Sequence, residues 1–374
     1  MSGLLMRAVL SLALAGAAVL LAVPPAEAQG APADGTDDSP HPLAHLDAGG
    51  DGAPRLLVQG FGDVEWMSVD APGTPSTFRL GQLVCFVSSR LTDDVSALAE
   101  VVVELDPGGN FMTDVERLLL TYSPGDYLSL RVGRYHTGIG YYNTAFHHGT
   151  YFETIAGRPA VFAFEDEGGP LPVHEVGLSA SGRLQVPGMR LEYTTEVGNG
   201  QRWNASAGYI TPTLVDSNGT KAVNVGLAIE PDAVPGLRLG ASSYRDRVDD
   251  AGRAPVATRY DAAFLAYRHE AFEARAEMVW LHHRREGDRA FANQGFYIEA
   301  ARRFGAVRPY VRYERLRLAP DTPLVGRLLS VSGPTLGVRY DPMGPVAVKA
   351  QYEHLGDGVP SAVNRFRLQL AFAF

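Results

Sequence analysis

The chain has 374 residues, a formal net charge of −9, 20% charged residues and a single cysteine. One cysteine excludes an internal disulfide, and mild acidity with scattered rather than clustered arginines argues against a nucleic-acid partner. A chain of this length would ordinarily suggest two soluble domains.

The first 28 residues have the features of a cleaved secretory signal peptide: Arg7, a nearly continuous apolar run over 8–23, and the small-x-small site at 26–28. Residues 29–53 are rich in Gly, Pro, Ala and Asp and contain no Lys or Arg. This composition predicts a disordered periplasmic tail. Beyond it, no apolar run approaches the roughly 18 residues that a membrane helix needs. We therefore expect an exported chain that cannot cross a bilayer with a helix.

From Leu57 onward, segments of about ten residues alternate between apolar and polar side chains. In 345–354, for example, Val and Ala alternate with Lys349, Gln351 and Glu353. This period of two predicts strands with one apolar and one polar face. Because Arg or Lys on a lipid-facing surface costs about 2–4 kcal/mol at the midplane, the charged faces should point into a lumen. The predicted strands are 57–66, 78–88, 95–105, 114–122, 127–135, 173–182, 189–197, 222–230, 237–245, 258–268, 272–282, 293–303, 307–317, 334–341, 345–354 and 365–374.

The connections between these strands alternate in length, which gives an independent test of the fold. Every second connection is a compact turn, as at 91–94, 123–126, 186–188, 231–236, 269–271, 304–306 and 341–344. The others are expected to be longer throughout, as at 136–172, 198–221, 246–257, 283–292, 318–333 and 355–364. A soluble all-β protein has no reason to keep this parity, whereas an outer-membrane barrel does. The sequence therefore predicts an all-β, antiparallel transmembrane β-barrel of about 16 strands over residues 54–374.

The last strand ends on Phe372 and Phe374, which share its apolar face. A terminal aromatic on such a strand resembles the signal by which outer-membrane β-barrels of Gram-negative bacteria are recognised and inserted. This resemblance implies location in the outer membrane, with its lipid and the barrel-assembly machinery as partners.

The connection 136–172 is by far the longest and is aromatic rather than strongly polar. A long loop inside a compact fold is usually functional or disordered. We expect this one to fold inward and narrow a channel, held to the barrel wall by hydrogen bonds. The residues predicted to anchor it are His136, Tyr141, Asn143, His147, His148 and His174.

The run 133–143, the His-His-Gly step at 147–149 and the stretch 164–174 resemble a block in porin-like outer-membrane proteins of Gram-negative bacteria. The specific resemblance covers roughly residues 130–178. It departs from the family block at Gly138, where the block has Pro, and at Tyr142, where it has Trp. General porins use their own third external loop to narrow the pore, and the resemblance implies no catalytic residues. Analogy with general porins also predicts a homotrimer, although the sequence shows no interface.

If the loop lies in the lumen, its acids would face a basic wall across a narrow constriction. The transverse field would orient dipolar solutes and bias ion passage. The alternative is that these charges solvate a wide lumen and pair with Glu299, Glu314 and Glu353. Whether anions or cations are preferred stays open. The predicted constriction comprises Glu165, Asp166 and Glu167 of the loop and Arg308, Arg312, Arg339, Lys349, Arg365 and Arg367 of the wall.

The loop histidines with Glu153, Glu165 and Asp166 could bind a transition metal, but their spacing matches no helical metal motif. We therefore expect hydrogen-bonding roles and no metal or other cofactor. Gly-x-Ser-x-Gly, Ser-x-x-Lys and phosphate-loop motifs are missing, so no catalytic residues are predicted and the chain is not expected to be an enzyme.

The sequence thus favours an outer-membrane porin that lets small hydrophilic solutes diffuse through a water-filled lumen narrowed by the 136–172 loop. Three rivals remain. A plugged barrel would bind a metal or ligand through its His-rich loop, an outer-membrane enzyme would have its site at the rim, and a structural or adhesive barrel would not conduct.

Overall fold

The computed structural model describes residues 55–105, 109–146, 149–216, 218–250, 252–325, 330–356 and 363–374. The predicted signal peptide 1–28 and tail 29–53 lie outside the described residues, as do His147 and His148. Within the described ranges, no helix is both long and apolar enough to cross a membrane.

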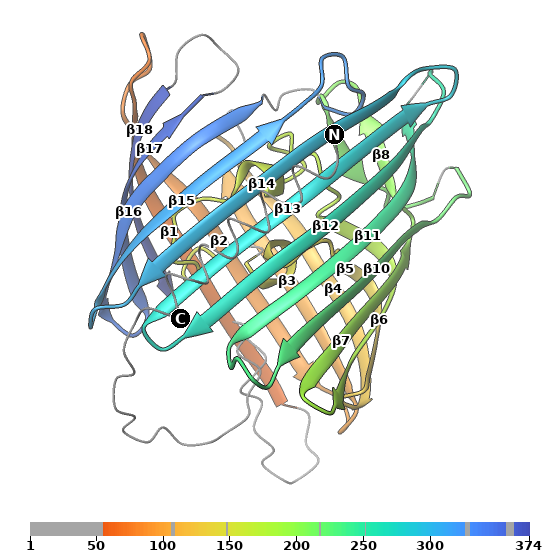
Figure 1. The fold of residues 1–374 in the computed structure, drawn as a ribbon, viewed down its shortest axis with the longest axis horizontal. Coiled ribbons are helices and arrows are strands. Elements are labelled where there is room, and N and C mark those ends of the chain that lie inside the picture. The colour runs from red at the N-terminus through yellow and green to blue at the C-terminus, as the bar shows by residue number, and fades with distance from the viewer. Residues whose placement is uncertain are drawn as a thin grey trace. The chain divides into compact units, whose positions relative to one another are not determined.

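The chain forms a closed antiparallel barrel (Figure 1). The described residues form eighteen strands. All but β8 and β9 pair with their neighbours in the barrel, which therefore has sixteen, and β1 pairs with β18 to close it. All sixteen predicted segments are strands of this barrel. The barrel strands are β1 (Arg55–Val69), β2 (Thr77–Arg90), β3 (Val95–Leu105), β4 (Phe111–Gly125), β5 (Leu128–His136), β6 (His174–Val186), β7 (Met189–Gly198), β10 (Ala222–Pro231), β11 (Leu237–Asp250), β12 (Val256–His269), β13 (Phe272–Arg285), β14 (Ala290–Arg302), β15 (Val307–Arg317), β16 (Val331–Met343), β17 (Val346–Leu355) and β18 (Val363–Ala373).

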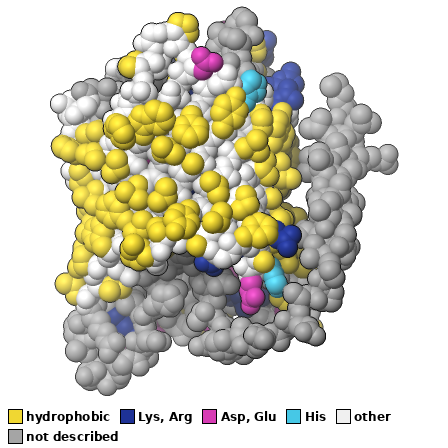
Figure 2. Space-filling model, turned by 90° about the vertical axis from the view of Figure 1, so that its left-hand side faces the viewer, with side chains coloured by type: hydrophobic (Ala, Val, Ile, Leu, Met, Phe, Trp, Pro, Cys, Tyr) yellow, Lys and Arg dark blue, Asp and Glu magenta, His cyan; other side chains and the backbone are white. Residues whose placement is uncertain are grey.

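The period-two pattern of the sequence sorts side chains between the two faces of the wall. In β10, Val223, Val225 and Leu227 are exposed on the outside, while Ala222 and Asn224 are buried. Figure 2 shows the result on the outer surface: apolar side chains form a broad belt, with the visible charges near its two edges. Such a belt between polar rims is typical of barrels that sit in a bilayer.

The barrel closes where the first strand meets the last. The Gly60 amide donates to the Phe374 carbonyl at 2.9 Å, and the Phe374 amide returns a bond to the Gly60 carbonyl at 2.8 Å. A Cβ atom on Gly60 would lie 2.5 Å from the Phe374 ring, and one on Gly62 would lie 3.3 Å from the Phe372 ring. The rings of Phe374 and Phe372 therefore pack over Gly60 and Gly62 across the seam. Aromatic side chains that cover glycines on a neighbouring strand stabilise strand pairing.

The sixteen barrel strands are counted here in chain order, leaving out β8 and β9. The connections after the first, third and every later odd-numbered strand lie at one end of the barrel, here called the loop rim. The other connections lie at the opposite end, called the turn rim. The predicted parity holds for the long connections, but the expectation that every loop-rim connection is longer is wrong. The loops 251–255 and 286–289 are no longer than the turn 232–236, because the flanking strands run further than the sequence indicated. The long connection 199–221 also contains a hairpin, β8 (Gln201–Asn204) with β9 (Tyr209–Pro212), which was not predicted.

Leu227→Arg should test whether a bilayer surrounds the belt. A charge at this mid-strand, outward position should cost about 2–4 kcal/mol of unfolding free energy in lipid, whereas near a rim the same change costs about 0–1 kcal/mol. Val234→Arg, in the exposed 232–236 turn, is the matched control. Urea unfolding in liposomes measures both, and equal costs for the two variants would argue against a lipid-facing belt.

Candidate functional site

Residues 137–173, between β5 and β6, are called the inner segment because they contact inward-facing side chains of the barrel. The segment contains the short helix α2 (Tyr142–Ala145) and the 3-10 turn η1 (Ala160–Phe162). It touches strands from β1 around to β17, so it crosses the space that the barrel encloses.

Barrel-wall acids accept the backbone N–H groups of the inner segment. Glu277 on β13 accepts from Tyr141 at 2.6 Å and from Tyr142 at 2.8 Å, at the start of α2. Glu196 on β7 accepts from Gly138 at 2.9 Å, and Glu314 on β15 accepts from Ala160 at 2.6 Å. A buried amide needs such a partner, and the first N–H groups of a helix have none within the helix.

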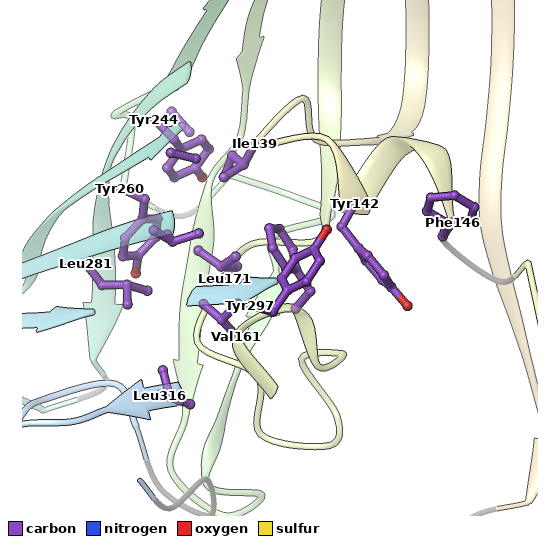
Figure 3. Close-up of a cluster of buried hydrophobic side chains, with 14 residues drawn as sticks. Ile139, Tyr142, Phe146, Val161, Leu171, Tyr244, Tyr260, Leu281, Tyr297 and Leu316 are labelled. Carbon is purple, nitrogen blue, oxygen red and sulfur yellow. The ribbon is translucent and has the colours of Figure 1, made fainter. Parts of the chain in front are cut away.

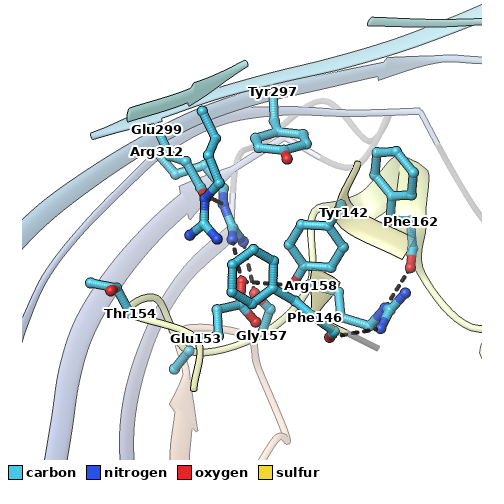
Figure 4. A network of polar contacts seen from close by, with 12 residues as sticks. Tyr142, Phe146, Glu153, Thr154, Gly157, Arg158, Phe162, Tyr297, Glu299 and Arg312 are labelled. Atoms are coloured by element: carbon cyan, nitrogen blue, oxygen red, sulfur yellow. Dashed lines mark hydrogen bonds and ion pairs between the residues drawn. The ribbon is translucent and has the colours of Figure 1, made fainter. Parts of the chain in front are cut away.

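Wall cations bind the carbonyl groups of the same segment. Arg339 donates to the carbonyls of Tyr151 at 2.6 Å and Glu153 at 2.9 Å, and Lys349 donates to the Thr150 carbonyl. Arg312 donates to the Gly157 carbonyl at 2.8 Å and to the Glu153 carboxylate at 3.0 Å (Figure 4). Burial raises the pKa of Glu153, and Arg312 opposes that rise.

The six basic residues predicted at the constriction therefore have definite partners. Arg308 contacts Thr154 at 3.0 Å, so four of the six, with Arg312, Arg339 and Lys349, hold the inner segment. The other two bind within the wall: Arg365 donates to Glu353 at 2.7 Å, and Arg367 donates to Glu65 at 3.1 Å. The ion pairs Arg312–Glu299 and Arg365–Glu353 match the alternative weighed from the sequence, in which wall charges pair with one another.

An apolar cluster adds packing to these polar contacts (Figure 3). Tyr142 is fully buried, with its ring centroid 5.4 Å from that of Phe162 and 5.8 Å from that of Tyr297 on β14. Burial raises the pKa of the Tyr142 hydroxyl, which donates to Glu153 at 2.6 Å. The cluster joins Ile139, Tyr142, Phe146, Val161, Phe162 and Leu171 of the segment to Ala222, Tyr244, Tyr260, Ala262, Val279, Leu281, Tyr297 and Leu316 of the wall.

The inner segment makes a second apolar contact with β1, across the closing seam from β18. Phe152 packs edge-on against Phe61 of β1, with ring centroids 5.8 Å apart, and Phe61 packs against Phe86 of β2 at 5.5 Å. The Tyr151 hydroxyl donates to the Gly344 carbonyl, in the turn between β16 and β17. The inner segment thus starts at the loop rim and reaches the turn rim.

Of the predicted anchoring residues that the structure describes, Tyr141 and Asn143 lie in the inner segment, whereas His136 and His174 belong to the wall strands β5 and β6. The Asn143 amide donates to the carbonyls of Thr137 at 2.8 Å and Val173 at 3.2 Å, so it joins the two ends. The Tyr141 ring lies 5.5 Å from that of Phe264 on β12. His136 and His174 are cross-strand partners on β5 and β6.

The three loop acids predicted at the constriction differ in surroundings. Glu165 is buried and accepts the N–H groups of Val173 at 2.7 Å and His174 at 2.9 Å. Asp166 and Glu167 have exposed side chains. Asp166 nevertheless lies in a recess crowded by protein atoms, and this partial burial, together with the negative charges of Glu104, Glu167 and Glu165, raises its pKa to about 6.

A cavity of about 610 Å³ opens beside these acids, between the ends of β3 and β4 and the β8–β9 hairpin. Its polar lining is mainly acidic, with two arginines. The charged lining residues are Glu104, Asp114, Glu116, Glu165, Asp166, Arg134 and Arg202, together with His174.

No family model and no curated protein sequence matches the chain. Solved structures do. The anion-selective porin from Comamonas acidovorans superimposes with a TM-score of 0.61 at 12% identity, covering 86% of this chain and 100% of that one. The chain has the porin fold. The resemblance to porin-like barrels noted in the sequence is therefore confirmed at the level of the fold.

Two further porin-fold structures give the same result. OmpT of Vibrio cholerae, in its trimer form, has a TM-score of 0.57 at 13% identity and covers 86% of this chain and 100% of its own. Salmonella typhi OmpF, in a complex with daunomycin, has a TM-score of 0.59 at 12% identity and covers 85% of this chain and 97% of its own. Identities this low establish a shared fold and leave the solute unspecified.

Glu277→Ala should loosen the inner segment without unfolding the barrel. The change removes the acceptor for the Tyr141 and Tyr142 amides and the Tyr297 hydroxyl, and each buried donor left without a partner costs about 1–3 kcal/mol. Amide hydrogen exchange over 139–146 should become faster, while exchange in the strands stays slow.

The matched control is Glu270→Ala, at an exposed glutamate in the turn between β12 and β13. This variant should leave the exchange of 139–146 unchanged. Unaltered exchange in Glu277→Ala as well would show that the carboxylate does not hold the segment.

Proposed function

We propose that the protein is an outer-membrane porin of a Gram-negative bacterium, through which small hydrophilic solutes diffuse passively past a fixed constriction. The observation that carries the proposal is the binding of the inner segment to inward side chains on strands around the barrel. A segment held at both its N–H and its carbonyl groups would set the width of an aqueous path without needing to move. We further propose that the chain is exported by a cleaved signal peptide and has no catalytic activity.

Insertion through the terminal strand, including Phe372 and Phe374, and assembly as a homotrimer belong to the same proposal. The porin fold, the apolar outer belt and the trimer form of OmpT from Vibrio cholerae support them. Chemical cross-linking in native membranes would test the trimer.

The charges around the inner segment support a preference for cations. The wall arginines and Lys349 are engaged by carbonyls and carboxylates, whereas Asp166 and Glu167 are exposed. Exposed carboxylates at a constriction raise the local concentration of cations. We infer a modest cation preference at neutral pH.

Conductance in planar bilayers tests the constriction. Because His136 and His174 are Cα partners, residues 138–172 can be replaced by a short glycine-containing turn without changing the strand register. Wild-type protein should show steady conductance, and the shortened variant should show a severalfold larger one. Heat-modifiable gel mobility would verify that both are folded.

A folded wild-type barrel that does not conduct, beside a shortened variant that does, would overturn the diffusion hypothesis. That outcome would favour the second candidate, a plugged barrel that binds a metal or ligand through its His-rich loop. Three contacts favour this alternative. Phe152 of the segment packs against β1, and the segment also accepts hydrogen bonds from Arg339 on β16 and Lys349 on β17. A segment that touches such distant parts of the wall could close the lumen.

Selectivity should depend on pH through Asp166. With a pKa of about 6, its carboxyl is charged at pH 8 and mostly neutral at pH 5, so cation preference should fall as the pH falls. Other carboxylates also titrate in this range, so the diagnostic comparison is with Asp166→Asn. Wild type and variant should differ in reversal potential at pH 8 and agree at pH 5. A difference that persists at pH 5 would contradict the assignment to Asp166.

A further inference from the structure

Two histidines and a glutamate converge at the loop-rim ends of β4, β5 and β6. Glu116, His136 and His174 are each less than 10% exposed. One ligand-type atom of each residue lies within 4.8 Å of those of the other two. The two imidazole rings meet edge to face, with centroids 5.5 Å apart. Imidazole nitrogen with carboxylate oxygen is the ligand set that zinc and neighbouring divalent metals take.

Irregular backbone builds this cluster. The pairing of β4 with β3 shifts from Arg117–Glu100 to Val115–Val101, so Glu116 is the extra residue of a β-bulge. Bulges re-aim side chains and are over-represented beside functional sites.

Gly133, three residues before His136, has a φ of 132°, a conformation that L side chains rarely adopt. A Cβ atom at position 133 would lie 1.9 Å from the Leu118 carbonyl oxygen. Only glycine at this position therefore allows β5 to approach β4 this closely. Cross-strand pairing then sets His136 beside His174.

Glu165 orients one of the two histidines. Its Oε2 atom lies 3.1 Å from Nδ1 of His174, while its Oε1 atom accepts the backbone N–H groups of Val173 and His174. Nε2 of His174 is thereby directed towards Glu116, with which it is in contact. A carboxylate on the second nitrogen of a histidine is the usual arrangement behind a metal-bound imidazole, since it fixes the tautomer and raises ligand basicity.

The charges fit a dication. Glu100 lies 3.8 Å from Nε2 of His136 and is neutralised by its ion pair with Arg117. Glu116 and Glu165 then contribute two negative charges, and each imidazole is neutral once it ligates a metal, so the set balances the charge of a dication. The 610 Å³ cavity is lined by Glu116, Glu165 and His174, with three further acids and two arginines, and gives a cation a route to the cluster.

We propose that Glu116, His136 and His174 form a binding site for one divalent transition-metal ion of the zinc type. Water from the cavity, or Glu100 after a small shift, supplies the fourth ligand of a tetrahedral site. The metal links β4 to the two strands from which the inner segment departs and returns, and Glu165 extends that link into the segment itself. The bound metal cross-links the strands at the two ends of the inner segment, and this role does not depend on whether the barrel conducts.

Cobalt(II) titration of the chelator-treated, refolded full-length barrel tests the site. Co²⁺ in a tetrahedral site gives intense visible d–d bands, so these should saturate at one ion per chain and be displaced by Zn²⁺. His174→Ala and His136→Ala should abolish the bands. Glu165→Gln, which keeps the size of the orienting side chain, should weaken Co²⁺ binding about 10–100-fold. His282→Ala, at an exposed histidine on β13, is the matched control and should bind like wild type.

Folded wild-type barrel without saturable bands would overturn the proposal and leave a hydrogen-bonded His–carboxylate cluster. Unchanged bands in Glu116→Gln and His136→Ala would overturn it as well, because the ion would then lie elsewhere. If His174→Ala does not fold, hydrogen exchange of the wild type decides. Zn²⁺ should slow the amide exchange of 134–138 and 172–176, and no change on adding Zn²⁺ would count against the site.

Discussion

The structure depends on one constraint: a polypeptide segment that crosses the inside of a barrel must have its backbone polar groups satisfied. The inward face of the wall supplies the partners. Glutamates such as Glu277 and Glu196 accept the N–H groups of the inner segment, while Arg339, Lys349 and Arg312 donate to its carbonyls. The charges on the polar face of the strands therefore act first as a complementary surface for this backbone. Among the described residues, the inward charges that do not bind this backbone or one another are the ones left exposed.

The barrel itself could be predicted from sequence because the constraints that define it act on residues close together in the chain. A lipid-facing belt imposes a period of two on every strand, and turns at one rim impose short connections, so both signals recur along the chain. Strand ends were harder to predict, because some strands continue beyond the belt into sequence that is largely polar on both faces. β11 and β13 accordingly run further than their apolar alternation does, through 246–250 and 283–285. The β8–β9 hairpin is stabilised by contacts such as Gln201 with Asp246, distant in sequence, and leaves no local pattern.

The interior could be predicted only in outline. The sequence indicated that the segment after His136 is unusual and that Arg and Lys line the wall, yet it gave no means of pairing one with the other. Tyr244, Tyr260 and Tyr297 form a hydrophobic surface that the segment packs against, and no local sequence pattern marks them for this role. The spacing of the histidines likewise matched no metal motif, because a cross-strand pair and a bulge, rather than a helix, bring His136, His174 and Glu116 together.

The seam between β1 and β18 has a consequence for the order of folding. Phe61 pairs with Ala373, so closure joins residues near the two extremes of the barrel and pays the largest loop-closure entropy of any strand pair. Most of the strands that hold the inner segment, β7 and β10 to β17, follow it in the chain, while β1, which contacts Phe152, precedes it. The β5–β6 hairpin can therefore present the segment early, and each later strand adds a partner to it. In a chain that folds from its first strands onward, the second half of the barrel would assemble around the segment and the seam would form last.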